Sequence, residues 1–210
     1  AEHYRDQGKK VLFMCDSITR LAMAQRQIGL AAGEPPATKG YTPSVFSLIP
    51  SLLERLGQGR ADQGSITGVL TVLVEGDDME DPVADTVRGV VDGHLVLSRK
   101  LASLGHYPPI DILESVSRTM PETVTESQLG WAAKIRALLA VWRENEELIR
   151  LGAYKKGTDP SVDEAILLHP KIELFLKQRT MEETLFQDTV RIMAALSGAE
   201  VAQPPSAAPP

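Results

Sequence analysis

The sequence predicts an α/β fold with a mostly parallel sheet, followed by an α-helical domain. Val11–Cys15 and Ile66–Val74 are continuous apolar segments, the pattern of strands buried on both faces. Segments with helical spacing alternate with these strands, which favours parallel pairing with helices on the faces of the sheet. Near Pro121 the pattern becomes helical throughout. The expected divisions are an α/β domain at 1–121, a helical domain at 122–198 and a disordered Pro/Ala-rich tail at 199–210.

The α/β part opens abruptly, because residues 1–10 have the pattern of the end of a helix, and we expect a piece of a longer chain. The first strand ends on Asp16, and the helix that follows runs from Ser17 to Ala32, where a Gly-Glu-Pro-Pro stretch stops it. The remaining expected elements are helices at 45–56 and 86–91 and strands at 66–74, 94–98 and 112–116.

The helical part begins with a long helix over residues 126–151. Asp159-Pro160 opens the next helix with proline at its first position, and His169-Pro170 is expected to interrupt that helix. Thr180–Glu183 resembles a capping box for the last helix, which should end near Gly198. One face of the long helix carries Ile135, Leu138, Leu139 and Trp142 and is expected to be core.

Composition excludes several classes of protein. The net charge of -6 over 210 residues argues against a chain that wraps nucleic acid. No segment approaches the roughly 20 apolar residues of a membrane helix, and the first residues lack a signal-peptide pattern, so we expect a cytoplasmic protein. Cys15 is the single cysteine and is expected to be a packed, inert thiol. The four histidines are scattered, which gives no indication of zinc.

Asp16 is the first candidate for chemistry. An apolar strand that ends in Asp is how P-loop ATPases present a carboxylate to the water shell of magnesium, although a strand-end Asp can equally be a helix cap. The phosphate-binding motif G-x-x-x-x-G-K-[ST] is absent, because Gly8-Lys9 lacks both the earlier glycine and the following hydroxyl. Asp16 is therefore either a cap, or part of a site whose phosphate loop lies upstream.

Longer blocks decide between these interpretations because they occur in one order. They are Val11–Arg20 (VLFMCDSITR), Gly33–Tyr41 (GEPPATKGY), Gly64–Thr67 (GSIT), Glu75–Asp78 (EGDD), Asp81-Pro82 and Ser115–Arg118 (SVSR). Together these blocks resemble the flagellar and type III secretion export ATPases, which are relatives of the catalytic beta subunit of rotary ATP synthase. The resemblance extends to about Ser197. It implies the C-terminal part of a RecA-like P-loop ATPase domain, followed by a helical domain.

The resemblance also implies roles for individual residues in binding ATP and Mg2+. Asp16 matches the carboxylate that orders magnesium through water, and Arg20 matches an arginine near the phosphate end of the nucleotide. Arg118 matches the arginine finger, which enters the site of the neighbouring subunit in trans. The alternative for Arg118 is a surface salt bridge.

Three residues fall at positions of the family's adenine pocket, and two of them match its pattern. Tyr107 falls where beta-type subunits stack a tyrosine on adenine, and Phe175 occupies a corresponding aromatic position. Met181 stands where the family has a second phenylalanine, so this part of the pocket departs from the pattern. The alternative is that Tyr107 and Phe175 are ordinary core aromatics.

Two loops match segments that face the central pore and stalk of the family's ring, Gly33–Pro43 and Glu75–Pro82. The second loop is strongly acidic, but its spacing lacks the alternating oxygen ligands of a calcium-binding EF-hand loop. A solvated loop or a contact with the stalk is the favoured interpretation.

The family implies a homohexameric motor that drives protein export. Its expected partners are stalk and stator-like regulators, export substrates and their chaperones, and a membrane export gate to which it binds peripherally at the inner face of the cytoplasmic membrane. In the resembling proteins the phosphate-binding lysine and the catalytic glutamate precede the region matched here, so this chain alone is expected to be inactive.

Three alternatives remain open. A rotary ATP synthase-type catalytic subunit is disfavoured because the acidic Asp-Glu-Leu-Ser-Glu-Glu-Asp stretch of synthase beta subunits is absent, and Pro160–Ala165 stands there instead. A non-catalytic module that binds a stalk or chaperone would lack the upstream phosphate-binding lysine. A hexameric RNA-translocating terminator is a more distant alternative, since the charge balance is acidic.

Overall fold

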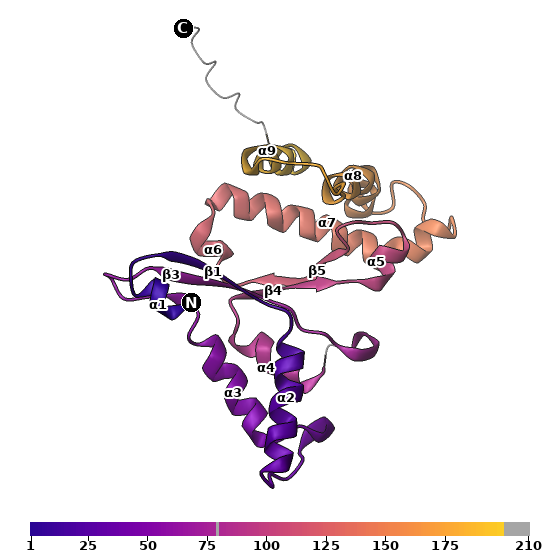
Figure 1. Ribbon diagram of the computed structural model, residues 1–210. Coiled ribbons are helices and arrows are strands. Elements are labelled where there is room, and N and C mark those ends of the chain that lie inside the picture. Colours follow the sequence, from indigo (N-terminus) through magenta and orange to yellow (C-terminus); the bar gives the residue numbers. More distant parts are fainter. Residues whose placement is uncertain (79, 200–210) are drawn as a thin grey trace, which may run out of the picture. The chain divides into compact units, whose positions relative to one another are not determined.

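The computed structural model describes residues 1–78 and 80–199, with the side chain of residue 77 left out (Figure 1). The described chain forms two compact units, residues 1–91 and residues 92–199. From residue 200 onward, the expected tail lies outside the described residues. Within the described part of the chain, no helix is long and apolar enough to cross a membrane.

The first unit contains a three-stranded sheet in the order β1-β3-β2. The strands β1 (Lys10–Cys15) and β3 (Ser65–Leu70) pair in parallel, and the register places Cys15 opposite Leu70. The short strand β2 (Gly57–Gln58) pairs antiparallel with the start of β3. Because β1 and β3 are parallel and in register, the residues that follow them emerge side by side at one edge of the sheet.

Helices of the first unit build its core. They are α1 (Glu2–Arg5), α2 (Ile18–Ala31), α3 (Pro43–Leu53) and α4 (Pro82–Val90), with 3-10 turns at Thr38–Gly40 and Glu75–Asp77. Fully buried Ile18, Val45, Ile49 and Val83 pack together, and partly buried Cys15 and Leu70 of the sheet pack against them.

The expectation that β1 is buried on both faces is wrong for this structure. Its residues alternate between partly buried and exposed, and Leu12 and Met14 are 61% and 73% exposed. The alternation arises because the helical core contacts the side of the strand that carries Cys15, while Leu12 and Met14 point to the opposite side.

The second unit begins with a two-stranded sheet made of β4 (Gly93–Leu97) and β5 (Ile110–Ser117). The α/β class is confirmed, but these two strands pair antiparallel, which corrects the expectation of parallel pairing for them. The connection between them carries only the five-residue helix α5 (Arg99–Ser103), in place of the longer helix that is usual in a parallel crossover.

The helical domain contains α6 (Met120–Thr123), α7 (Glu126–Arg150), α8 (Pro160–Leu176) and α9 (Phe186–Leu196). The long helix was predicted well, and a capping box of Thr125 and Gln128 starts it. Buried Ile135, Leu138, Ala165, Ile172 and Leu196 form the core of this bundle, and Trp142 packs against it as expected.

Two expectations for this domain are wrong. Helix α8 continues through Pro170, because buried residues on both sides of the proline, Ala165 and Ile172, hold the two halves against the same core. Thr180–Glu183 does not cap α9, which begins at Phe186. The carboxylate of Glu182 instead accepts a hydrogen bond from the backbone N–H of Arg179 at 3.0 Å, a local turn that competes with helix formation.

Candidate functional site

Asp16 lies where the sequence placed it, directly after the last residue of β1. The parallel register brings it beside Thr71, the residue that directly follows β3. The Thr71 hydroxyl donates a hydrogen bond of 2.6 Å to Oδ1 of Asp16. Both side chains are exposed to solvent. The edge of the sheet therefore presents an oriented carboxylate to a ligand outside it.

Backbone and hydroxyl groups join the start of α2 to the segment after β3. The backbone N–H of Ile18 donates to the carbonyl of Thr71 at 3.0 Å. The Thr19 hydroxyl accepts from the backbone N–H of Leu73 at 2.8 Å and donates to the Leu73 carbonyl at 3.2 Å. These bonds fix the first turn of α2 against the strand end, and Asp16 lies between the two elements.

Arg20 lies in this first turn and is exposed. Ser17 is the N-cap of α2 and accepts a hydrogen bond of 3.3 Å from the backbone N–H of Arg20. The structure thus brings Asp16 and Arg20 to the same end of the sheet. A carboxylate and a guanidinium there match the opposite charges of a metal ion and its phosphate ligand.

The donor set of this edge fits magnesium bound mainly by water and phosphate. Within residues 1–78 and 80–199, no three His, Cys, Asp or Glu side chains gather as a metal-binding cluster. Mg2+ commonly keeps several waters and uses only one or two carboxylates together with substrate phosphates. A single carboxylate, such as Asp16 provides, is enough for that kind of site.

The two loops expected to face a pore are linked by an ion pair. The ammonium of Lys39 donates to the carboxylate of Asp78 and lies 3.6 Å from that of Asp81. The hydrogen bond from Lys39 holds the pKa of Asp78 below its ordinary value. Asp81 also caps α4 by accepting from the backbone N–H of Val83 at 2.9 Å. The acidic loop is therefore partly neutralised by its neighbour.

Arg118 and Tyr107 belong to the second unit, and both are exposed. Arg118 directly follows β5, and its backbone N–H donates to the carbonyl of Asp92 at 2.7 Å. Tyr107 lies between α5 and β5, where its carbonyl accepts from the backbone N–H of Gln178 at 2.8 Å. This bond ties the Tyr107 loop to the segment just after α8.

The other two adenine candidates flank that segment. Phe175, in the last turn of α8, is partly buried and packs against the core of the helical bundle. Met181 is 91% exposed between α8 and α9. Tyr107 is 55% exposed, so it is not a core aromatic. The second unit thus presents one exposed ring and one exposed thioether near the end of α8.

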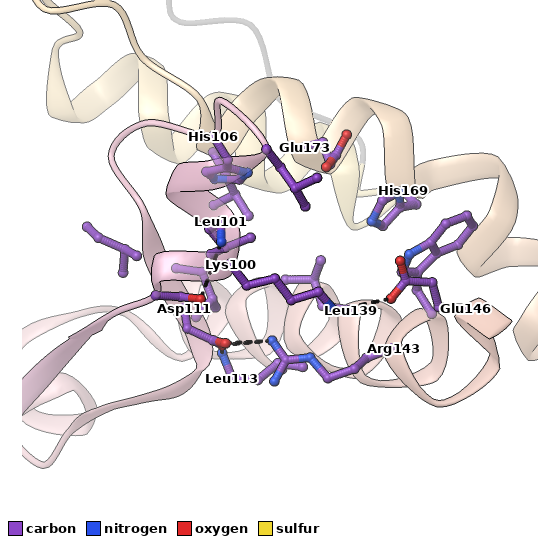
Figure 2. Close-up of a pocket in the computed structure, with 16 residues that line it drawn as sticks. Lys100, Leu101, His106, Asp111, Leu113, Leu139, Arg143, Glu146, His169 and Glu173 are labelled. Carbon is purple, nitrogen blue, oxygen red and sulfur yellow. Dashed lines mark hydrogen bonds and ion pairs between the residues drawn. The ribbon is translucent and has the colours of Figure 1, made fainter. Parts of the chain in front are cut away.

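A groove of about 370 Å³ lies in the second unit, between α5 and β5 on one side and α7 and α8 on the other (Figure 2). Arg143 bridges to Asp111 at 2.8 Å, and Lys100 lies 3.9 Å from Glu146. Trp142 stacks on His169 with ring centroids 3.8 Å apart. The residues predicted for nucleotide binding do not line this groove.

His106 lies in the wall of the groove and was not singled out by the sequence. It is 5% exposed, and neither ring nitrogen has a hydrogen-bond partner among the described residues. Burial lowers the pKa of His106, with the Lys177 charge as a further cause. Burial therefore favours the neutral form of this imidazole.

Thr71 and Thr19 were also missed by the sequence. A signal for Thr71 existed, because a hydroxyl directly follows the second parallel strand just as Asp16 follows the first. No comparable signal marks Thr19, whose bonds to Leu73 depend on the tertiary fold.

An α/β unit with a carboxylate at the end of a parallel strand, followed in the chain by a helical bundle, is the arrangement expected of a nucleotide-binding domain of the ATP synthase type. Comparison with known families agrees. Residues 1–117 match the ATP synthase alpha/beta family, nucleotide-binding domain, and residues 124–195 match the T3SS EscN ATPase C-terminal domain. The chain belongs to the ATP synthase alpha/beta family, as the resemblance predicted.

Several curated relatives are named flagellum-specific ATP synthase. The chain is 52% identical over 200 residues to the flagellum-specific ATP synthase of Bacillus subtilis, covering 95% of this chain and 45% of the relative. It is 51% identical over 193 residues to that of Salmonella typhimurium, covering 92% and 42%. The chain therefore spans about half the length of the curated relatives it matches.

The assembled ATPase EscN from the type III secretion system of enteropathogenic E. coli has the same fold. It matches with a TM-score of 0.90 and 46% identity over 94% of this chain and 47% of EscN. EscN in complex with its central stalk EscO matches with a TM-score of 0.84 and 44% identity, over 94% and 46%. The expected RecA-like fold with a C-terminal helical domain is thereby confirmed.

Proposed function

We propose that this chain is the C-terminal half of a subunit of a homohexameric ATPase that drives protein export through a flagellar or type III secretion apparatus. The observation that carries the proposal is the Asp16 carboxylate held by Thr71 at the carboxyl ends of β1 and β3. It occurs in a chain about 50% identical to flagellum-specific ATP synthases. The domain boundary is placed at 121/122, with an ATPase portion before it and a helical domain after it.

Asp16 and Arg20 serve the subunit's own site in this proposal. Asp16 accepts a hydrogen bond from a water of the magnesium ion, and Arg20 places positive charge near the terminal phosphates of ATP. Magnesium supplies charge neutralisation of the phosphoryl oxygens when it is bound. The exposure of both side chains supports these roles, because each can reach a ligand outside the sheet edge.

Arg118 serves a neighbouring subunit's site. An exposed arginine directly after a strand can extend from its own subunit, and positive charge near the transferring phosphoryl group stabilises the transition state. Tyr107, Phe175 and Met181 are proposed to contact adenine. Tyr107 has an exposed ring for stacking, whereas Phe175 must use the part of its surface that the bundle core leaves open.

The proposed partners follow from the same relatives. A stalk protein is supported by the EscN complex with EscO, and the loops joined by Lys39 and Asp78 are the proposed contact. Stator-like regulators, export substrates, chaperones and a membrane export gate complete the set, with a cytoplasmic location at the inner face of the membrane. The similarity of residues 124–195 to an EscN C-terminal domain favours an export ATPase over a rotary ATP synthase subunit.

The test is ATP hydrolysis by the full-length protein, with single substitutions in this chain. We expect Asp16→Asn and Arg118→Ala each to lower kcat by about 100-fold or more, the scale found for lost electrostatic stabilisation of a transition state. Arg118→Ala should leave nucleotide binding close to wild type, because an arginine finger stabilises charge that develops in the transition state and not in the bound nucleotide.

Arg150→Ala is the matched control for Arg118, since Arg150 is also exposed but lies at the end of α7. It should hydrolyse ATP at the wild-type rate. The 210-residue chain by itself should show no hydrolysis above background, because it lacks the phosphate-binding motif. Wild-type turnover by Arg118→Ala would refute the arginine-finger role. Absence of any turnover in the full-length protein would instead favour a non-catalytic binding module.

A further inference from the structure

We propose that Thr71 is a positioning residue that orients the Asp16 carboxylate toward a magnesium-bound water. This inference rests on the proposed function, because it assigns a second residue to the same magnesium site. The observation that carries it is the hydrogen bond of 2.6 Å from the Thr71 hydroxyl to Oδ1 of Asp16.

That bond restricts the carboxylate. An O–H···O⁻ hydrogen bond of this length is charge-assisted and among the stronger kinds of hydrogen bond. With Oδ1 engaged by Thr71, rotation of the Asp16 side chain is limited, and Oδ2 is the carboxylate oxygen that this bond leaves available to a ligand. Outer partners that orient a direct metal ligand typically change metal affinity by about 10- to 100-fold when they are removed, and because Asp16 acts through a water, we expect the lower end of this range for Thr71.

Two backbone hydrogen bonds, one to Cys15 and one from Ile18, fix the position of Thr71. Its backbone N–H donates to the Cys15 carbonyl at 3.0 Å, and its carbonyl accepts from the backbone N–H of Ile18 at 3.0 Å. The backbone of Thr71 is therefore bonded to the residues on either side of Asp16 and Ser17. This places the Thr71 hydroxyl at a fixed distance from the Asp16 carboxylate.

A purely structural role explains the hydroxyl less well. The two backbone bonds already join the strand ends, and Thr19 adds two further bonds between α2 and Leu73. Thr71 is exposed, so its hydroxyl would be satisfied by water if Asp16 were absent. What the hydrogen bond from the Thr71 hydroxyl adds to these contacts is a fixed orientation of the Asp16 carboxylate.

The test compares Thr71→Val, which removes the hydroxyl and keeps the branched shape, with Thr71→Ser, which keeps the hydroxyl. Thr67→Val is the matched control, because Thr67 is an exposed threonine within β3, four residues before Thr71. Two quantities are measured in the full-length protein. They are the Mg2+ dependence of ATP hydrolysis, and the affinity for Mn2+ by electron paramagnetic resonance in the presence of a non-hydrolysable ATP analogue.

We expect Thr71→Val to need about tenfold more Mg2+ for half-maximal turnover and to bind Mn2+ about tenfold more weakly. Thr71→Ser and Thr67→Val should stay close to wild type in both measurements. The thermal unfolding midpoint of Thr71→Val should match that of Thr67→Val, since the effect is on the metal site.

Three results overturn the inference. Wild-type behaviour of Thr71→Val, with both readouts lost in Asp16→Asn, would refute the role of Thr71 and leave the proposed function standing. A drop in the unfolding midpoint of Thr71→Val alone, with unchanged Mn2+ affinity, would make the bond a structural tether. Failure of the wild-type protein to hydrolyse ATP and to bind Mn2+ with the analogue would refute the proposed function and this inference together.

Discussion

Asp16 and Arg118 occupy equivalent positions at the scale of the residue, since each directly follows the last residue of a strand. Both are exposed, and a local hydrogen bond fixes each of them. For Asp16 this bond comes from the Thr71 hydroxyl, and for Arg118 it joins its backbone N–H to Asp92. The end of a strand is rigid along the sheet yet open to solvent, which suits a group that must meet a ligand at a defined place.

His106 and His169 are the titratable residues whose protonation bears most directly on the second unit. Burial lowers the pKa of each below its ordinary value of 6.5. Glu173 opposes this shift for both rings, whereas Lys177 reinforces it. Because the folded pKa is lower, the unfolded chain takes up a proton more readily as the pH falls below 6.5, so acid favours unfolding.

The free energy of unfolding of the wild type should therefore decrease as the pH is lowered from about 7.5 to about 5.5. The decrease should be smaller in His106→Leu, which lacks this titrating group. Urea unfolding at the two pH values measures this difference. The stability at issue is present above the ordinary histidine pKa and is lost as the pH passes through the lower, folded value. An equal loss in His106→Leu and wild type would show that His106 does not contribute.

At the scale of the helices and strands, the sequence predicts best those elements that have strong local signals, such as a proline at the first helical position or a long amphipathic pattern. Asp159-Pro160 starts α8 as expected, and the long amphipathic pattern gave α7 nearly to its ends. The errors came from tertiary structure. Core contacts of Ala165 and Ile172 on either side of Pro170 kept α8 continuous, and the antiparallel pairing of β4 with β5 is a tertiary contact that local propensity does not reveal.

The candidate site was predictable only in part for the same reason. Asp16 and Arg20 follow from the strand-to-helix pattern and the ordered blocks of the sequence. Their partner Thr71 lies 55 positions from Asp16 along the chain, and only the register of β1 with β3 brings the two together. The exposed outer side of β1 could not be read from the sequence, because an apolar strand reads alike whether or not its second face is covered.

Thr125 and Thr180 provide a direct test of where helices begin. The Thr125 hydroxyl accepts from the backbone N–H of Gln128 at 3.3 Å, and the Gln128 side chain accepts from the Thr125 N–H at 2.9 Å. Thr125→Ala should therefore lower the free energy of unfolding by about 1 kcal/mol. Thr180→Ala should stay within about 0.5 kcal/mol of wild type, because α9 begins only at Phe186.

Chemical or thermal unfolding of the two variants and of the wild type under identical conditions measures these two changes in the free energy of unfolding. A larger loss for Thr180→Ala than for Thr125→Ala would restore the capping box that the sequence suggested at residues 180–183. It would also contradict the turn in which Glu182 accepts from Arg179.

At the scale of the whole molecule, the proposed chemistry is divided between subunits. Asp16 and Arg20 belong to the unit formed by residues 1–91, and Arg118 belongs to the unit formed by residues 92–199. In a homohexamer each active site would combine the Asp16 of one subunit with the Arg118 of its neighbour. A head-to-tail ring repeats that combination at every interface.

Mixing two inactive full-length variants tests this division. In a ring assembled from equal amounts of Asp16→Asn and Arg118→Ala subunits, about one interface in four pairs an intact Asp16 with an intact Arg118. We expect the mixture to regain ATP hydrolysis up to about a quarter of the wild-type rate, whereas each variant alone stays inactive. The measurement is turnover after co-assembly, with rings of each single variant as controls. If Arg118 acts on the site of its own subunit, every site in the mixture still carries one of the two substitutions, and no activity returns.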